Sequence, residues 1–203
     1  PLFDRQCNSL VKNIKINDFG IIAEFKRRSP SKKNINSSLS VTKVAKEYED
    51  ADVSGMSVLT DGKYFSGSLE DLILSRSIIS LPLLRKDFVI DEYQIIEAKA
   101  NGADVILLIA AILTRNEIKN FSSLANNLGL EVLLEVHNLE EIQKSIMPTI
   151  DLFGVNNRNL KTFEVSLETS RSLAENIPDQ FLKISESGIS EPNSIKELIE
   201  FGY

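Results

Sequence analysis

Short runs of apolar residues alternate along the chain with longer segments in which apolar residues recur every three or four positions. The short runs are typical of buried strands, and the periodic segments are typical of amphipathic helices. The short runs predict strands near residues 20–26, 56–60, 83–86, 105–109, 131–136, 152–156 and 182–187. The periodic segments predict helices near residues 41–52, 69–79, 92–101, 115–128, 139–145, 167–176 and 192–201. The pattern therefore predicts seven βα units.

Two local signals place the ends of these helices. At three helix starts, a short polar residue is followed three positions later by Gln or Glu, the pattern of a reciprocal cap that satisfies free backbone N–H groups. These pairs are Asp91 with Gln94, Thr114 with Glu117, and Asn138 with Glu141. Gly102 and Gly129 follow amphipathic segments, where a left-handed residue commonly ends a helix.

The alternation fits either an open doubly wound sheet or a closed (β/α)8 barrel. An open sheet usually carries a glycine-rich phosphate loop after its first strand, and the chain contains neither G-x-G-x-x-G nor G-x-x-x-x-G-K-[ST]. The barrel is therefore favoured, and 203 residues, 42% of them hydrophobic, suit a single domain over 1–203. A complete barrel takes about 250 residues. We expect an α/β fold that is a truncated (β/α)8 TIM barrel, incomplete at both ends, with a gap between its first and seventh strands.

The overall charge narrows the choice of partners. A net charge of -6 argues against a general binder of nucleic acid or membrane surfaces, because such partners are held mainly by excess positive charge. The single cysteine, Cys7, excludes an internal disulfide and fits a reducing compartment, so a cytoplasmic location is expected. Because His137 is the one histidine, the chain has no Cys/His set for a zinc site. The longest apolar run, residues 105–113, is too short to span a bilayer.

Ionisable or amide side chains follow most of the predicted strands. Glu24 and Lys26 end the first strand, and Asn156 and Arg158 end the sixth. Side chains two positions apart share one face of a strand, so the members of each pair should point the same way. In a parallel α/β barrel, catalytic groups occupy this position. Polar groups on so many strand ends suggest one shared pocket.

Five sequence blocks carry these polar groups, in a fixed order across nearly the whole chain. They are EFKRRSPS at 24–31, SVLTDGKYFSGS at 57–68, LRKDF at 84–88, NNRNL at 156–160 and SESGI at 185–189. Together, in order and spacing, they resemble the indole-3-glycerol-phosphate synthase family. The resemblance implies a (β/α)8 barrel of tryptophan biosynthesis, a carboxy-lyase that closes the indole ring of 1-(2-carboxyphenylamino)-1-deoxyribulose 5-phosphate with loss of carbon dioxide and water. It also implies that no metal or organic cofactor is needed.

The resemblance assigns roles residue by residue. Lys86 matches the family's general acid, Glu135 and Glu24 match carboxylates that accept protons, and Lys26 matches a residue that binds the substrate anion. The chemistry fits these types, because ring closure requires a carbonyl oxygen to be protonated and a hydroxyl to leave as water. The residues implied for substrate binding are Ser29, Phe65, Leu107, Asn156, Arg158, Ser187 and Gly188. Ser187 and Gly188 form half of a phosphate cradle, and the family's second half, after strand eight, is absent from the sequence.

Several polar residues also have a purely structural interpretation. The basic side chains of the first loop are expected to be solvated; they are Arg27, Arg28, Lys32 and Lys33. Asp61 and Asp87 are expected to organise loops, and His137, which enters a helix, is expected to be structural.

Two alternatives stay open. Phosphoribosylanthranilate isomerase is a barrel of the same pathway, but it needs a catalytic Cys and Asp on strand ends, and Cys7 precedes the first strand. A noncatalytic or inactive truncated phosphate-binding barrel is the other, since the chain is expected to lack the family's N-terminal helix and its last βα unit. The partners implied are a sugar-phosphate substrate and, by fusion or in a complex, other tryptophan-pathway enzymes.

Overall fold

The seven predicted strands are present and form one sheet. The computed structural model describes residues 2–35 and 38–203. The strands are β1 (Ile22–Phe25), β2 (Gly55–Leu59), β3 (Leu83–Lys86), β4 (Val105–Ile109), β5 (Glu131–Val136), β6 (Leu152–Asn156) and β7 (Leu182–Glu186). Their order in the sheet is their order in the chain, with β1 and β7 as the terminal strands. Neighbouring strands pair in parallel, which requires a crossover segment after each strand. The predicted α/β fold of seven βα units is confirmed.

Helices supply these crossovers. The α-helices are α1 (Leu10–Ile16), α2 (Val41–Asp50), α3 (Gly62–Phe65), α4 (Leu69–Ile78), α5 (Glu92–Ala100), α6 (Arg115–Asn127), α7 (Leu139–Ser145), α8 (Glu168–Leu173) and α9 (Pro192–Glu200). Short 3₁₀ turns are η1 (Leu2–Asp4), η2 (Ala110–Ile112) and η3 (Ala174–Asn176). The sequence predicted seven of the α-helices but not α1 or α3. Within residues 2–35 and 38–203, no helix is long and apolar enough to cross a membrane.

The helix ends follow the predicted signals, with one difference. Both reciprocal bonds form in the pairs Asp91 with Gln94 and Thr114 with Glu117. At the start of α7, the Asn138 side chain accepts from the backbone N–H of Glu141 at 2.9 Å, but the Glu141 carboxylate accepts from the backbone N–H of His137, at 2.8 Å, one residue earlier than predicted. Gly102 and Gly129 have φ angles of 92° and 74°, so both take the expected left-handed conformation.

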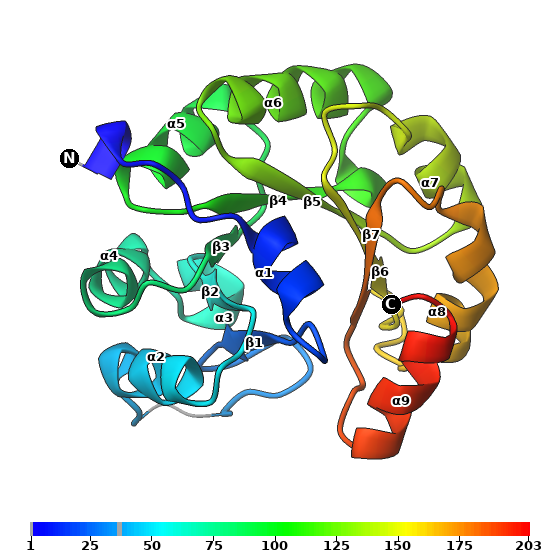
Figure 1. Ribbon diagram of the computed structural model, residues 1–203, viewed down its shortest axis with the longest axis horizontal. Helices are drawn as coiled ribbons and strands as arrows, with labels where there is room; N and C mark the ends of the chain where they lie inside the picture. Colours follow the sequence, from blue (N-terminus) through cyan, green and yellow to red (C-terminus); the bar gives the residue numbers. More distant parts are fainter. Residues whose placement is uncertain (1, 36–37) are drawn as a thin grey trace. The chain divides into compact units, whose positions relative to one another are not determined.

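The chain divides into two compact units, Pro1–Leu107 with Leu124–Glu131, and Leu108–Ser123 with Val132–Tyr203. In the first unit, α2 and α4 pack side by side on the outer side of β1 to β3 (Figure 1). Fully buried Met56 and Val58 of β2 lie in its core. In the second unit, α8 lies against β6, and the rings of Phe153 and Phe181 meet edge to face at 5.1 Å.

The N-terminal helix α1 is anchored by a carboxylate at its start and by a leucine along its side. Glu131 accepts hydrogen bonds from the backbone N–H groups of Leu10 and Val11, at 2.8 and 3.0 Å, where the helix dipole favours negative charge. Leu10 is 1% exposed, and its Cδ1 lies 2.6 Å from the position that a Cβ on Gly55 would take. Glycine at the start of β2 therefore makes room for the helix.

A buried carboxylate ties the segment before α1 to the body of the first unit. Asp104 is fully buried and accepts from Arg76 and from the backbone N–H of Leu83, each at 2.8 Å, and from the backbone N–H of Asn8 at 2.7 Å. Arg5 adds a second ion pair to the same carboxylate. Burial of a carboxylate is costly unless its charge and lone pairs are satisfied, and here several donors do so.

We predict that Leu10→Ala lowers the free energy of unfolding by about 3 kcal/mol, because it removes buried methyl groups and leaves a cavity against Gly55. Urea unfolding monitored by circular dichroism measures the change. The matched control is Ile16→Ala in the same helix, where the side chain is 72% exposed and the expected change is within about 0.5 kcal/mol. Equal effects of the two substitutions would contradict the packing role of Leu10.

Candidate active site

In the first unit, two lysines converge on one carboxylate at the carboxyl ends of β1 and β3. The ammonium of Lys86 lies 2.9 Å from Glu24 Oε2, and the ammonium of Lys26 contacts Glu24 Oε1. Alternate strands of a parallel barrel contribute side chains to the same interior layer, which is why β1 and β3 meet across β2. Glu24, Lys26 and Lys86 are called here the lysine–glutamate cluster. The sequence predicted all three members for the site.

The cluster is only partly open to solvent. Its side chains are 24% exposed at Glu24, 34% at Lys26 and 21% at Lys86. Burial by itself disfavours the charged carboxylate, but the nearby charges of Lys86 and Lys26 and their hydrogen bonds outweigh it and lower the pKa of Glu24 to about 2. Glu24 is therefore an anion at neutral pH.

Three aromatic rings meet in the segments that follow β2 and β3. Phe65 of α3 and Tyr64 lie against Phe88, with ring centroids 6.4 and 6.1 Å apart. The Asp61 carboxylate accepts from the backbone N–H groups of Tyr64 and Phe65 and so forms the N-cap of α3, which confirms its expected loop role. Leu107, also predicted, is 2% exposed within β4. Phe88 was not predicted as a site residue, although it lies two positions after Lys86.

The first loop is held by Arg27, contrary to the expectation that its basic side chains are solvated. The Arg27 guanidinium makes two bonds to the Asp71 carboxylate, at 2.6 and 2.7 Å, and one to the Ser66 carbonyl at 3.1 Å. Asp71 is 4% exposed, and the hydrogen bond that Arg27 donates to it is the main cause that raises the pKa of Arg27. Lys32 and Lys33 are exposed, as predicted. The expectation for Arg27 was wrong because its partner Asp71, near the start of α4, is far from it in the sequence.

Ser29, a predicted binding residue, lies in a tight turn of this loop. Its backbone exchanges hydrogen bonds with Lys32, at 2.9 and 3.1 Å, and its hydroxyl accepts from the backbone N–H of Lys32 at 3.1 Å. The hydroxyl also lies 3.2 Å from that of Ser31. The structure therefore places Ser29 in local turn contacts, and a contact with substrate remains a proposal.

Asp87 organises the segment that follows Lys86, as expected. Its carboxylate accepts from the Thr60 hydroxyl at 2.6 Å, from Arg85 at 3.1 Å and from the backbone N–H of Phe88 at 2.8 Å. Arg85 is 3% exposed and also donates to Thr60 at 3.1 Å. These bonds join the ends of β2 and β3 and restrict the backbone on both sides of Lys86.

In the second unit, Glu135 at the end of β5 faces the only histidine of the chain. Glu135 is 5% exposed, and its Oε1 lies 3.4 Å from His137 Nε2. On the other side of the ring, Nδ1 lies 3.3 Å from Glu141 Oε2. An imidazole thus lies between two carboxylates. The sequence predicted Glu135 as a site residue and His137 as a structural one. The structure brings the two side chains together.

Four further predicted residues lie in the second unit, after β6 and β7. Asn156 Oδ1 accepts from the backbone N–H of Arg158 at 3.0 Å, and the Arg158 guanidinium donates to the Phe163 carbonyl at 3.1 Å. Ser187 and Gly188 have φ angles of 70° and 78°. A Cβ on Gly188 would lie 2.3 Å from Val165 Cγ1, so this position requires glycine both for its backbone conformation and for space.

Two residues of the second unit were missed by sequence reasoning. Asn157 is 2% exposed and joins the Ser170 hydroxyl, at 2.9 Å, to the Ser187 carbonyl, at 3.2 Å. Glu186 lies at the end of β7, and its Oε1 is 2.1 Å from the position that a Cβ on Gly154 would take. Glycine in β6 therefore makes room for this carboxylate. Both residues lie inside the sequence blocks that carry the family resemblance, and this position could have marked them as site residues.

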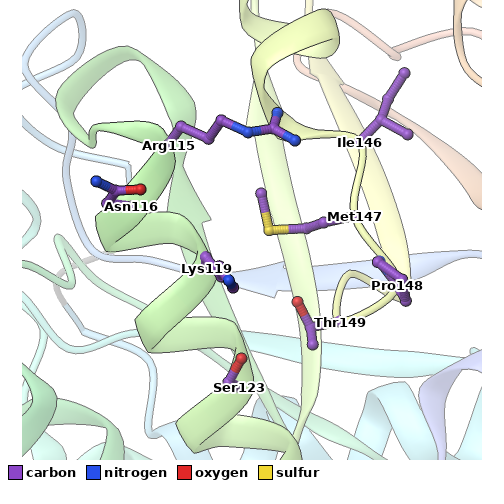
Figure 2. Close-up of a pocket in the computed structure, with 8 residues that line it drawn as sticks. All are labelled: Arg115, Asn116, Lys119, Ser123, Ile146, Met147, Pro148 and Thr149. Carbon is purple, nitrogen blue, oxygen red and sulfur yellow. The ribbon is translucent and has the colours of Figure 1, made fainter.

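The second unit also has a hollow on its surface, between α6 and the segment after α7. It has a volume of about 340 Å³, and its lining includes Arg115, Lys119 and Met147 (Figure 2). None of the predicted site residues lines it. In the part of the chain that the structure describes, no group of three or more His, Cys, Asp or Glu side chains is placed to hold a metal ion.

Comparison with protein families decides what this set of residues is. The family model for indole-3-glycerol phosphate synthase matches residues 4–203. The chain belongs to this family. Its enzymes are carboxy-lyases of tryptophan biosynthesis, and this is the function of the chain.

Curated relatives from the indole-3-glycerol phosphate synthase family are close in sequence and longer than the chain. The enzyme of Bacteroides thetaiotaomicron is 46% identical over 195 residues, which are 96% of this chain and 75% of that protein. The enzyme of Koribacter versatilis is 46% identical over 183 residues, which are 90% of this chain and 70% of that protein. The chain therefore spans about three quarters or less of these two relatives.

Solved structures support the fold. A tryptophan synthase complex from Pyrococcus furiosus contains a chain with a TM-score of 0.63 at 14% identity, covering 90% of this chain and 84% of that one. A mutant tryptophan synthase α-subunit from the same organism has a TM-score of 0.65 at 15% identity, covering 89% and 83%. These subunits are TIM barrels, so the predicted barrel-type fold with seven βα units is supported by structure as well as by sequence.

We predict that the contribution of the Glu24 charge to stability depends on pH. The folded-state pKa of Glu24, about 2, lies below the ordinary 4.5, so this contribution is present above about pH 4.5 and is lost as the pH falls towards 2. Urea unfolding should show that the stability difference between the protein and Glu24→Gln changes over this range, by at most about 3 kcal/mol. The control, Glu47→Gln, replaces a glutamate that is 60% exposed. A Glu24→Gln difference that is constant with pH would contradict an ionised Glu24 held by lysines.

Proposed function

We propose that the chain carries out indole-3-glycerol-phosphate synthesis with Lys86 as general acid and with Glu24 and Glu135 as proton acceptors. The substrate would be 1-(2-carboxyphenylamino)-1-deoxyribulose 5-phosphate, and the products indole-3-glycerol phosphate, carbon dioxide and water. The observation that carries the proposal is the lysine–glutamate cluster, in which an ionised Glu24 holds the ammonium of Lys86 at 2.9 Å.

The chemistry assigns an order of proton movements to these groups. As the aromatic carbon attacks the sugar carbonyl, negative charge develops on the carbonyl oxygen, and an ammonium such as that of Lys86 can donate a proton to it. Loss of carboxylate then restores the aromatic ring. Departure of the hydroxyl as water requires one proton to be added to the hydroxyl, which suits a lysine ammonium, and another to be removed from the new ring, which suits a carboxylate such as Glu135 or Glu24. These proton transfers need one protonated group as acid and one deprotonated group as base.

Lys26 and the turn after β7 suit the two anionic ends of such a substrate. Lys26 is the more exposed lysine of the cluster, so its charge can meet a substrate carboxylate. Ser187 and Gly188 both have positive φ angles, and we propose that backbone N–H groups of this turn meet the phosphate. We propose that Asn156 and Arg158 orient the sugar, that Phe65 and Leu107 contact the aromatic ring, and that Ser29 closes the first loop.

Other readings of the chain find less support. A phosphoribosylanthranilate isomerase would need a cysteine at a strand end, whereas Cys7 precedes α1 and its Sγ accepts from the Lys99 ammonium at 3.1 Å. A noncatalytic barrel would not require two lysines beside one carboxylate. We further propose that residues 1–203 belong to one barrel domain, that the enzyme acts in the cytoplasm, and that its partners include other tryptophan-pathway enzymes.

We predict that Lys86→Met lowers kcat by about 10² or more, because general acid catalysis contributes roughly that much. Fluorescence of indole-3-glycerol phosphate formed from the substrate measures the rate, and circular dichroism checks that the variant folds. Lys119→Met, at an exposed position outside the proposed site, is the control. A variant with turnover within a few-fold of the parent would show that Lys86 is not the acid.

We predict that Glu135→Gln lowers kcat far more than it raises KM, because a proton acceptor acts in the transition state and contributes little to ground-state binding. Steady-state kinetics over a range of substrate concentrations separates the two constants. Glu140→Gln, at an exposed position of α7, provides the control. A rise in KM with unchanged kcat would instead assign Glu135 to substrate binding.

A further inference from the structure

The His137 ring is held from one side by the start of α7. Glu141 Oε2 accepts from the backbone N–H of His137 at 2.8 Å and lies 3.3 Å from its Nδ1. The same carboxylate accepts from the Asn138 side chain at 2.9 Å through its other oxygen. Backbone and side chain of His137 are therefore tied to one carboxylate, which limits the rotation of the imidazole.

The other nitrogen of the ring is directed at the proposed proton acceptor. His137 Nε2 lies 3.4 Å from Glu135 Oε1, and both side chains are largely buried, at 15% and 6% exposure. Nε2 is buried and makes no hydrogen bond to a described residue, so its approach to Glu135 is a contact between the two groups and not a hydrogen bond. Catalytic hydrogen bonds are often long in the free enzyme and shorten in the complex with substrate, so 3.4 Å is compatible with a functional contact.

Three carboxylates act on the charge of the His137 ring. They are Glu135 from β5, Glu141 from α7 and Glu186 from β7. Burial opposes protonation of the imidazole, but the hydrogen bond to Glu141 and the charges of these three carboxylates outweigh it and raise the pKa of His137. Burial likewise opposes the charged form of Glu141, and the contacts with His137 reverse this and lower the pKa of Glu141.

We propose that His137, held in place by Glu141, is a positioning residue that keeps the buried Glu135 ionised and oriented to accept a proton from the substrate. The inference rests on the proposed role of Glu135. It replaces the expectation that His137 is purely structural. The geometry follows the general logic of a carboxylate that orients an imidazole, which in turn faces the reacting group.

The consequence is a defined dependence on pH. A positive neighbour stabilises the anionic form of Glu135, so its loss should make Glu135 take up a proton at a higher pH. A shift of one pKa unit corresponds to a tenfold change in the ratio of ionised to protonated carboxylate at a given pH. His137→Gln should therefore move the acidic limb of the kcat/KM profile upward by about one pH unit.

The first test observes the ring directly, because His137 is the single histidine of the chain. In the ¹⁵N-labelled enzyme, imidazole resonances in a long-range ¹H–¹⁵N spectrum need no assignment by mutation. Titration should give a midpoint above the ordinary value of 6.5. Glu135→Gln and Glu141→Gln should each lower the midpoint, whereas Glu140→Gln, on the exposed face of the same helix turn, should leave it nearly unchanged. A midpoint at or below 6.5, insensitive to Glu135→Gln, would overturn the proposal.

The second test follows activity. His137→Gln should lower kcat/KM about tenfold on the acidic side and recover towards the parent value at higher pH, with the fold retained by circular dichroism. A purely structural role would instead give a loss that is the same at every pH, and this outcome would overturn the inference. If Glu135→Gln leaves kcat unchanged, the proposed role of Glu135 fails; if Glu135→Gln is damaging and the His137→Gln profile does not shift, only the inference about His137 fails.

Discussion

The arrangement of this protein depends on the cost of removing charged side chains from water at the ends of strands. A lone carboxylate in the position of Glu24 would take up a proton, because burial disfavours its charged form. Lys26 and Lys86 reverse that tendency and lower the pKa of Glu24 to about 2. The same contact keeps an ammonium in place on Lys86. One electrostatic constraint thus keeps Glu24 ionised and holds Lys86 beside it.

In the first unit, charged side chains have different roles before the strands begin and after the strands end. Before β4, Asp104 is fully buried and its oxygens are occupied by arginines and backbone N–H groups, so it stabilises the fold and has little capacity left for chemistry. After β3, Lys86 remains 21% exposed and can still meet a ligand. Barrels generally divide stability and catalysis between their two faces in this way. In the second unit, the His137 ring lies between the carboxylates of Glu135 and Glu141.

Much of the fold could be predicted because its signals are local. Apolar runs marked all seven strands, and polar pairs such as Asp91 with Gln94 marked helix starts, since strand burial and helix capping involve neighbours in sequence. The helices α1 and α3 were missed. The start of α1 is held by Glu131, which is distant in sequence, and α3 has only four residues and is capped by Asp61. Arg27 was misjudged for a related reason, because its partner Asp71 is brought to it only by folding.

The sequence by itself determined the seven βα units, the family and the identity of the residues at the strand ends, because alternation, motif order and spacing are properties of a linear chain. Only the tertiary structure decided which of these residues act on one another. Glu24 and Lys86 are far apart in sequence and meet because β1 and β3 flank β2 in a parallel sheet. His137 could be read as a structural residue until its ring was placed between Glu135 and Glu141. Protonation states follow from distances and burial, and these exist only once the chain has folded.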